Sequence, residues 1–217
     1  MQIRKDKLQD ASYDLKFLLN RGYRKKNAIS FVSNKYLLSK HERNYLARSI
    51  YSDITVKSRM DKILDISAIN NQCILLDGYN VLITVESICK KDYESLILCN
   101  DGIIRDLNAV FGKYKFNKFT RKALDTILDV LYGYKPSRII FLFDKQVSFS
   151  GKLAKMTKEL MNLQKINGEV LLSNNVDFEL VKIAKIEKCV VFTSDSVIID
   201  KVTKIVDLPF YLLQKGS

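Results

Sequence analysis

The sequence predicts an α/β protein with a central parallel sheet, preceded by a small all-α module. From residue 72 onward, short apolar runs alternate with amphipathic helical segments, a pattern typical of doubly wound parallel sheets. The first 55 residues instead carry apolar side chains at three- and four-residue spacing, which is typical of helices. We therefore expect a helical module over residues 1–55, a connection over 56–71 and an α/β domain over 72–217.

The helical module is expected to hold three short helices. Leu8, Ala11 and Leu15 share one face of a helix over 6–20, and a second helix is expected over 25–35. Ser39 and Glu42 form a capping-box pattern, which predicts the start of a third helix. The arrangement resembles a helix-turn-helix bundle, although many trihelical modules only pack on a neighbouring domain.

Basic charge is concentrated in this module. Residues 1–62 hold 15 Lys and Arg against 6 Asp and Glu, whereas residues 63–217 hold 21 against 18. A basic module beside a nearly neutral domain favours a nucleic-acid partner; the alternative is that lysine only keeps the protein in solution. The module's expected nucleic-acid-binding side chains are Arg21, Arg24, Lys25, Lys26, Lys35, Lys40, Arg43 and Arg48.

The α/β domain is expected to alternate strands and helices along its length. Strands are expected over 72–77, 95–100, 138–144, 169–173 and 188–195, with a last edge strand over 204–210. Helices are expected over 119–132, 150–165 and 176–187, and another begins at 196. Neither a GxGxxG nor a P-loop pattern occurs, which argues against a nucleotide cofactor and P-loop chemistry.

Acidic residues follow most of the expected strands. Asp77, Asp144 and Asp195 end apolar runs, Asp177 begins the helix after the fourth strand, and Asp101 follows the second. Because the carboxyl ends of parallel strands lie along one edge of a sheet, we expect these carboxylates to converge. A helix N-cap role accounts well for Asp177 and partly for Asp195, but poorly for Asp77.

Clustered carboxylates raise one another's pKa and destabilise a fold unless a cation neutralises them. Mg²⁺ and Mn²⁺ prefer oxygen ligands, and such an ion can activate a water toward a phosphodiester. The sequence contains one histidine, His41, to which we assign no role. Metal-assisted hydrolysis with Mg²⁺ or Mn²⁺ is therefore the chemistry that this set of residues favours.

The four cysteines are scattered and form no CxxC pair. We expect buried, reduced thiols in a cytoplasmic protein rather than zinc ligands or disulfides. The N-terminus has no apolar core typical of a signal peptide, and no apolar run is long enough to span a membrane.

The strings LLDGYNVLI, FLFD, VDFELV and TSDSVII resemble motifs of the PIN-like nucleases, particularly the NYN branch. With CNDGIIRDL and FDKQVSFSG, and preceded by LLNRGYRKKNAISFV and LSKHERNYL, they resemble an uncharacterised archaeal and bacterial family. Its members join a small helical module to a PIN-like domain, and the resemblance covers nearly the whole chain. It implies a Rossmann-like PIN fold and, by superfamily analogy, metal-dependent ribonuclease activity.

The resemblance also implies roles for individual residues. Asp77, Asp144 and Asp195 match the metal-binding aspartates of the superfamily, and Asp177 matches an additional acid. The further residues that the resemblance or their position brings into the site are Asn80, Asp101, Asp106, Ser148, Ser194, Ser196 and Asp200. Lys145 is expected either to bind the scissile phosphate or to neutralise the acidic cluster.

The favoured function is a metal-dependent endoribonuclease whose basic module binds nucleic acid, RNA rather than DNA. One alternative is a non-catalytic nucleic-acid-binding or regulatory protein on a degenerate PIN-like scaffold, and another is a protein-interaction module. Apolar residues near the C-terminus, from Phe210 to Leu213, either complete the core or form the edge of a homodimer.

Overall fold

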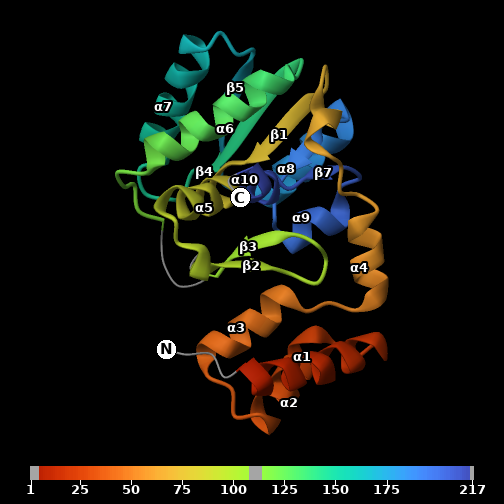
Figure 1. Cartoon of the computed structure of the whole chain (residues 1–217). Coiled ribbons are helices and arrows are strands. Elements are labelled where there is room, and N and C mark those ends of the chain that lie inside the picture. Colours follow the sequence, from red (N-terminus) through yellow and green to blue (C-terminus); the bar gives the residue numbers. More distant parts are fainter. Residues whose placement is uncertain (1–4, 108–113, 216–217) are drawn as a thin grey trace.

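The computed structural model describes residues 5–107 and 114–215 of the 217-residue chain. Its main sheet is parallel and contains β1 (Cys73–Asp77), β4 (Arg138–Asp144), β5 (Gly168–Ser173), β6 (Val190–Phe192) and β7 (Ile205–Val206). The strand order is β5-β4-β1-β6-β7, so β1 lies at the centre (Figure 1). The expected α/β class with a central parallel sheet is confirmed.

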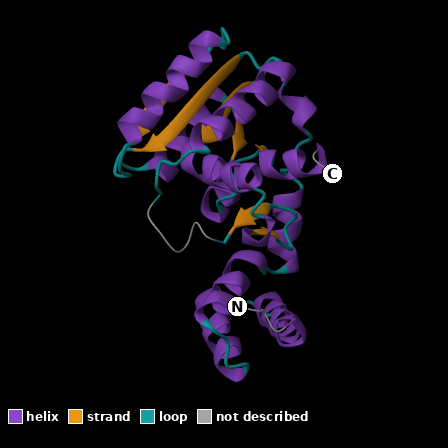
Figure 2. Ribbon diagram, turned by 60° about the vertical axis from the view of Figure 1, so that its left-hand side comes forward, coloured by secondary structure: helices purple, strands orange, loops and turns teal. Residues whose placement is uncertain are grey.

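Helices cover both faces of this sheet (Figures 1 and 2). One face packs on α5 (Gly78–Lys90), α6 (Thr120–Tyr134), α7 (Ser150–Leu163) and α10 (Leu208–Lys215). The other face packs on α8 (Val176–Glu187) and α9 (Ser196–Lys201). Because both faces are covered, the central strands need apolar side chains throughout, which is why they appear as continuous apolar runs in the sequence.

Alternation along the strands divides the core into two clusters. Ile74 and Leu76 of β1 join the cluster beneath α5, α6 and α7, whereas Leu75 joins the cluster beneath α8 and α9. In β4, Ile140 and Leu142 likewise belong to the α8 and α9 side. By the same alternation, Asp77 and Asp144 fall on the α8 and α9 side of the sheet.

The N-terminal region is helical, as expected. It contains α1 (Lys5–Asn20), α2 (Lys25–Lys35) and α3 (Lys40–Ser49), which bury a small core that includes Leu8, Leu15 and Leu46. The capping box at Ser39 and Glu42 is present, with both reciprocal hydrogen bonds formed.

The segment expected to be a connection over 56–71 contains regular structure. A further helix, α4, spans Asp53–Met60 and is N-capped by Ser52, and a 3-10 helix, η1, spans Ile66–Ile69. Arg59 of α4 is buried, so this segment packs against the α/β domain rather than running over its surface.

The strand expected over 95–100 is not part of the parallel sheet. A short 3-10 helix, η2 (Tyr93–Ser95), leads into β2 (Leu96–Leu98), which pairs antiparallel with β3 (Ile104–Asp106). This hairpin lies between the helical region and the main sheet (Figures 1 and 2). The apolar run indicated a strand correctly, but its partner is only a few residues away, and a tight turn then favours antiparallel pairing.

The last expected strand, over 204–210, is also shorter than predicted. Only Ile205 and Val206 pair with β6, and α10 follows at once from Leu208. Tyr211 and Leu212 pack against the core of the α5 and α6 face, so this end of the chain contributes to the core. None of the helices within the described ranges is long and apolar enough to cross a membrane.

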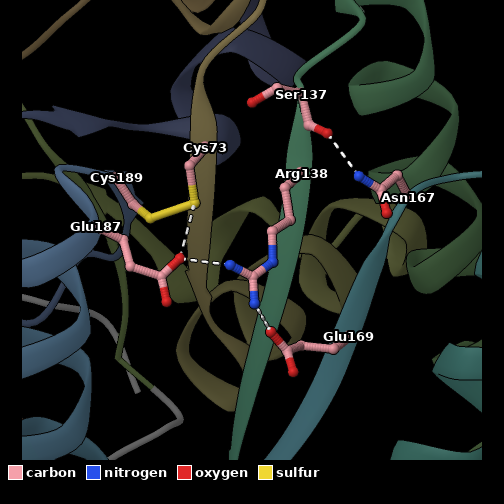
Figure 3. Close-up of a disulfide and its surroundings, with 7 residues drawn as sticks. All are labelled: Cys73, Ser137, Arg138, Asn167, Glu169, Glu187 and Cys189. Carbon is pink, nitrogen blue, oxygen red and sulfur yellow. Dashed lines mark hydrogen bonds and ion pairs between the residues drawn. A yellow bond between two sulfur atoms is a disulfide. The ribbon is translucent and has the colours of Figure 1, made fainter.

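Cys73 and Cys189 form a disulfide, which corrects the expectation of reduced thiols (Figure 3). Cys73 begins β1 and Cys189 immediately precedes β6, and the register of these parallel strands sets the two side by side. The sequence separation is 116 residues, so the pairing is visible only once the strand order is known. Cys89 and Cys99 are free thiols.

Candidate functional site

The carboxyl ends of the central strands form an acidic edge, which we define as Asp77, Asp144, Asp177 and Asp195. Asp77 ends β1, Asp144 ends the neighbouring strand β4, and Asp195 lies three residues beyond β6 on the other side of β1. Asp177 is the second residue of α8, which follows the outer strand β5. The strand order therefore brings together four acids that are spread over 119 residues of sequence.

Asp77 is the most buried member of the acidic edge, with 8 % of its surface exposed. Its Oδ2 accepts a 2.8 Å hydrogen bond from Oγ1 of Thr193, at the end of β6. The next residue, Gly78, begins α5 against β4: a Cβ there would collide with the Phe143 ring and lie 2.8 Å from the Leu142 carbonyl oxygen. Glycine at this position therefore lets the chain turn into α5 directly behind the carboxylate.

The electrostatics of these acids are those of a cluster. Burial, reinforced by the charges of Asp195 and Asp177 and opposed by the Thr193 hydrogen bond, raises the pKa of Asp77 to about 7. Partial burial, followed by the charge of Asp195 and then that of Asp144, also raises the pKa of Asp177. Neighbouring carboxylates thus make Asp77 and Asp177 harder to ionise.

Hydrogen bonds hold the other members of the site in place. Asp195 caps α9 by accepting from the amides of Val197 and Ile198 through Oδ1. Asp144 accepts a 2.8 Å bond from the Gln146 amide, also through Oδ1. In each aspartate these bonds engage one carboxylate oxygen and leave Oδ2 outside them.

Asn80 and Ser194 lie beside Asp77 and join α5 to the end of β6. The Asn80 side-chain oxygen accepts bonds from the Ser194 amide and hydroxyl, at 3.1 and 2.5 Å. Ser194 is buried, so it fixes the site instead of facing a ligand.

The chemistry of the acidic edge suits a hard divalent cation, because its donors are carboxylate oxygens. No three of these four aspartates have carboxylate oxygens that all lie within 4.8 Å of one another. In the described ranges, the three residues whose potential ligand atoms lie that close together are Cys73, Glu187 and Cys189. Mg²⁺ commonly keeps several waters and binds through one or two carboxylates, so its donors need not close to that distance. The Cys and Glu group lies at the opposite end of the strands, where the sulfurs are joined (Figure 3).

Three acids expected near the site have other partners. Asp101, in the turn of the β2–β3 hairpin, is fully buried and forms ion pairs with Arg59 and Arg105. Asp106 ends β3 and accepts a hydrogen bond from Ser87. Asp200 receives two hydrogen bonds from Arg59. Asp101 and Asp106 belong to the hairpin, which is not part of the parallel sheet. Asp200 lies in the last turn of α9, and its carboxylate is held by Arg59.

The arginines in this network were not identified from the sequence. Arg105 donates to Asp101 and, through Nε, to the backbone oxygen of Ser194, so it joins the hairpin to the end of β6. Burial opposes its charge, but the bonds to Asp101 more than compensate and raise the pKa of Arg105. The sequence does contain a sign of this pair: Arg105 lies in an apolar strand segment, and Asp101 precedes it by four residues. That spacing allows an ion pair across a tight turn.

The remaining serine and lysine candidates lie at the rim. Ser148 and Lys145 are exposed in the segment after β4, and Ser196 bonds through its hydroxyl to the Tyr51 hydroxyl at 2.7 Å. Against the larger effects of burial and of Asp195, the charge of Lys201 in α9 lowers the pKa of Asp177.

The basic residues of the helical region fall into two groups. Arg21, Arg24, Lys26 and Lys40 are exposed. The others are engaged or partly covered: Lys35 pairs with Asp14, Arg43 donates to Leu38 and Asn34, Lys25 lies over the Tyr51 ring, and Arg48 is half-buried.

Exposed aromatic side chains accompany these cations, and sequence reasoning missed them. Tyr13, Phe17, Tyr23 and Phe31 are 73 %, 48 %, 58 % and 66 % exposed, and the Arg21 guanidinium lies 4.4 Å from the centre of the Phe17 ring. Tyr13 and Phe17 lie on α1, Phe31 lies on α2, and Tyr23 lies in the turn between them. Large aromatic residues at these otherwise polar positions are the sequence signal that could have identified them. Aromatic rings among cations are typical of surfaces that bind single-stranded nucleic acid.

Comparison with known proteins identifies relatives along almost the whole chain. Residues 7–62 match a family described as Protein of unknown function (DUF434), and residues 66–211 match one described as Domain of unknown function (DUF5616). The Uncharacterized protein MJ0935 of Methanocaldococcus jannaschii is 41 % identical over 203 residues, which is 93 % of this chain and 94 % of that protein. No solved structure matches the chain. The chain therefore belongs to the family described as Domain of unknown function (DUF5616), and its N-terminal residues 7–62 match DUF434.

Proposed function

We propose that this protein is a metal-dependent nuclease of PIN-like type that hydrolyses phosphodiester bonds in RNA. The observation that carries the proposal is the acidic edge at the centre of the sheet, in which burial and neighbouring carboxylates raise the pKa of Asp77 to about 7. Buried like charges are costly, and a divalent cation removes that cost.

Asp77, Asp144 and Asp195 would hold Mg²⁺ or Mn²⁺, with Asp177 as an additional acid. The ion would supply an activated water and stabilise charge on the phosphodiester. Thr193 keeps one oxygen of Asp77 in a fixed direction, and the Asn80–Ser194 bonds hold the start of α5 against the end of β6. These contacts orient the carboxylates before substrate arrives, which reduces the reorganisation needed during reaction.

The helical region would bind the nucleic-acid strand. Its exposed cations attract phosphates, and its exposed rings offer faces on which bases stack. Tyr51 and Ser196 link this region to α9, directly after Asp195, so a strand held by the helices would lie near the acidic edge.

Cleavage by the full chain tests the proposal. Single-stranded and structured RNA, and DNA of the same sequences, would be incubated with Mn²⁺, Mg²⁺ or EDTA. We expect metal-dependent RNA cleavage by wild type and by Asp61→Asn, a control at an exposed acid on the C-terminal side of α4. Asp77→Asn should abolish cleavage while RNA binding, followed by fluorescence anisotropy, persists. Equal trace activity in wild type and Asp77→Asn would refute the nuclease.

A second candidate is a nucleic-acid-binding protein without catalysis. The exposed aromatic and basic side chains of the helical region favour binding independently of the acidic edge. This function predicts strongly salt-dependent RNA binding, no cleavage with any divalent ion, and no heat when Mn²⁺ is titrated into the protein. Mn²⁺ heat that disappears in Asp77→Asn would instead support the nuclease.

A further inference from the structure

A cleft of about 610 Å³ lies where the helical region meets the α/β domain. Lys25 and Lys26 at the start of α2, Tyr51, Arg59 of α4, and Ser196 and Asp200 of α9 line it, and Ile29 and Ala47 add apolar surface. Figure 1 shows α4 beside α9 above the helical region, as the contacts between these two helices require. The volume is in the range of sites that hold a small organic ligand.

Positive charge exceeds negative charge around the cleft. Arg59 donates hydrogen bonds to both carboxylate oxygens of Asp200 and to one of Asp101. Arg105 donates to both carboxylate oxygens of Asp101. Both carboxylates are therefore committed to the two arginines. Lys25 has no ion pair with a carboxylate in the described part of the chain; its ammonium lies 3.4 Å from the centre of the Tyr51 ring.

A further cation, Arg48, lies behind the cleft without lining it, and the charge of Arg105 acts on it. Among the described residues, the buried Nε of Arg48 has no hydrogen-bond partner. Burial, together with the charges of Arg59 and Arg105, lowers the pKa of Lys25 to about 7. Placing cations together without counter-charges is costly, and an anion in the cleft would offset that cost.

The local backbone and hydroxyl groups also suit an anion. Lys25 and Lys26 occupy the first turn of α2, where the helix dipole is positive, and the residue before it is Arg24, whose side chain has no acceptor for the free amides. The Tyr51 and Ser196 hydroxyls share one hydrogen bond, so one of their two hydrogens remains for a ligand oxygen.

We propose that this cleft binds the phosphate of a nucleotide, with Lys25 and Lys26 as its charged contacts. The nucleotide is either free or the phosphorylated end of a strand, since both present the same phosphate and a sugar and base of suitable size. The cleft is distinct from the acidic edge, and binding there does not require cleavage.

Isothermal titration of the full chain in EDTA tests this site, with AMP, adenosine, inorganic phosphate and a pentanucleotide with or without a 5′-phosphate. We expect AMP to bind and adenosine not to bind. Lys25→Met should weaken AMP by about tenfold or more, because a charged contact to phosphate is lost. Lys26→Gln, at an exposed position that leaves folding intact, should also weaken AMP, whereas Lys57→Met on the same helix as Arg59 should not.

The two phosphate sources differ in outcome. A 5′-phosphorylated pentanucleotide that binds more tightly than AMP and than its 5′-hydroxyl form identifies a strand end, and equal affinity for AMP identifies a free nucleotide. Absence of AMP and phosphorylated-strand binding at millimolar concentrations, or equal affinities in wild type, Lys25→Met and Lys26→Gln, would overturn the proposal. Asp77→Asn should bind AMP as wild type does, so the failure of this site and the failure of the nuclease are separate results.

Discussion

Thr193 donates a 2.8 Å hydrogen bond to the buried carboxylate of Asp77, and this bond joins the ends of two adjacent parallel strands. The same Thr193 oxygen accepts from the Asp195 amide, so one hydroxyl positions two acids of the edge. The relationship explains how the chain tolerates a carboxylate that is only 8 % exposed near other acids.

Thr193→Val removes this hydroxyl while keeping the side-chain shape. We expect it to lower the free energy of unfolding by about 1–3 kcal/mol, because the Asp77 oxygen and the Asp195 amide lose their partner. The pKa of Asp77 should rise further, since the bond that lowered it is gone, and Mn²⁺ affinity should fall. Urea unfolding measures the change in stability, and Mn²⁺ titration measures the change in metal affinity. Thr203→Val, at an exposed position, is the control. If Thr193→Val and Thr203→Val unfold at the same urea midpoint, Thr193 does not stabilise the acidic edge.

Without divalent ions, stability should fall as pH rises from about 4 to about 7, since the ordinary Asp pKa is about 3.9. The folded pKa of Asp77 is raised to about 7 and that of buried Asp207 to about 6, so the folded state holds more protons in this window. Asp77→Asn should flatten much of the slope and raise the melting temperature near neutral pH. Thermal melts across the window test this, with Asp61→Asn expected to keep the wild-type slope.

At alkaline pH the opposite slope is expected from Lys25. Its pKa is lowered to about 7 by burial and by nearby arginines, so the unfolded state holds more protons between about pH 7 and about pH 10. Stability should therefore rise with pH in that window, by at most about 4 kcal/mol. Denaturant titrations at several pH values should show the rise in wild type and Lys57→Met, and its loss in Lys25→Met. If stability still rises with pH in Lys25→Met, a titratable group other than Lys25 causes the rise.

Gly78→Ala should destabilise the fold by about 1–3 kcal/mol, because the added Cβ meets the Phe143 ring and the Leu142 carbonyl oxygen. Gly133, within α6, has no atom within 4 Å of an added Cβ. Gly133→Ala should therefore be neutral or stabilising by up to about 1 kcal/mol, since alanine favours helix. Urea midpoints of the two variants compare these sites directly, and similar midpoints would argue against a close approach at Gly78.

The Cys73–Cys189 disulfide should make stability depend on the redox conditions. Because it closes a loop of 116 residues, reduction should lower the free energy of unfolding by about 2–5 kcal/mol. Cys73→Ser should abolish the response to reductant, while Cys89→Ser, at a free thiol, should keep it. Peptide mapping under non-reducing conditions identifies the bond, and recovery of Cys73 as a free thiol from oxidised protein would contradict it.

The sequence was sufficient for those features that depend on local patterns. The apolar runs that end at Asp77 and Asp144 indicated buried parallel strands, because a strand covered on both faces has little room for polar side chains. The Ser39–Glu42 capping box likewise needs only three residues of spacing. Patterns that extend over only a few residues were therefore enough to predict the α/β class and to identify Asp77 and Asp144 at strand ends.

Tertiary structure decided the pairings between distant segments. β2 comes from the same kind of apolar run, but it pairs with β3 in a separate hairpin. Asp101, in the turn of that hairpin, therefore forms ion pairs with Arg59 and Arg105 instead of joining the acidic edge. Strand order set Cys73 beside Cys189, and packing of α2 against Tyr51 left Lys25 without a counter-charge in the described chain. These outcomes depend on which surfaces meet, because burial and charge balance are properties of the packed molecule and not of the local sequence.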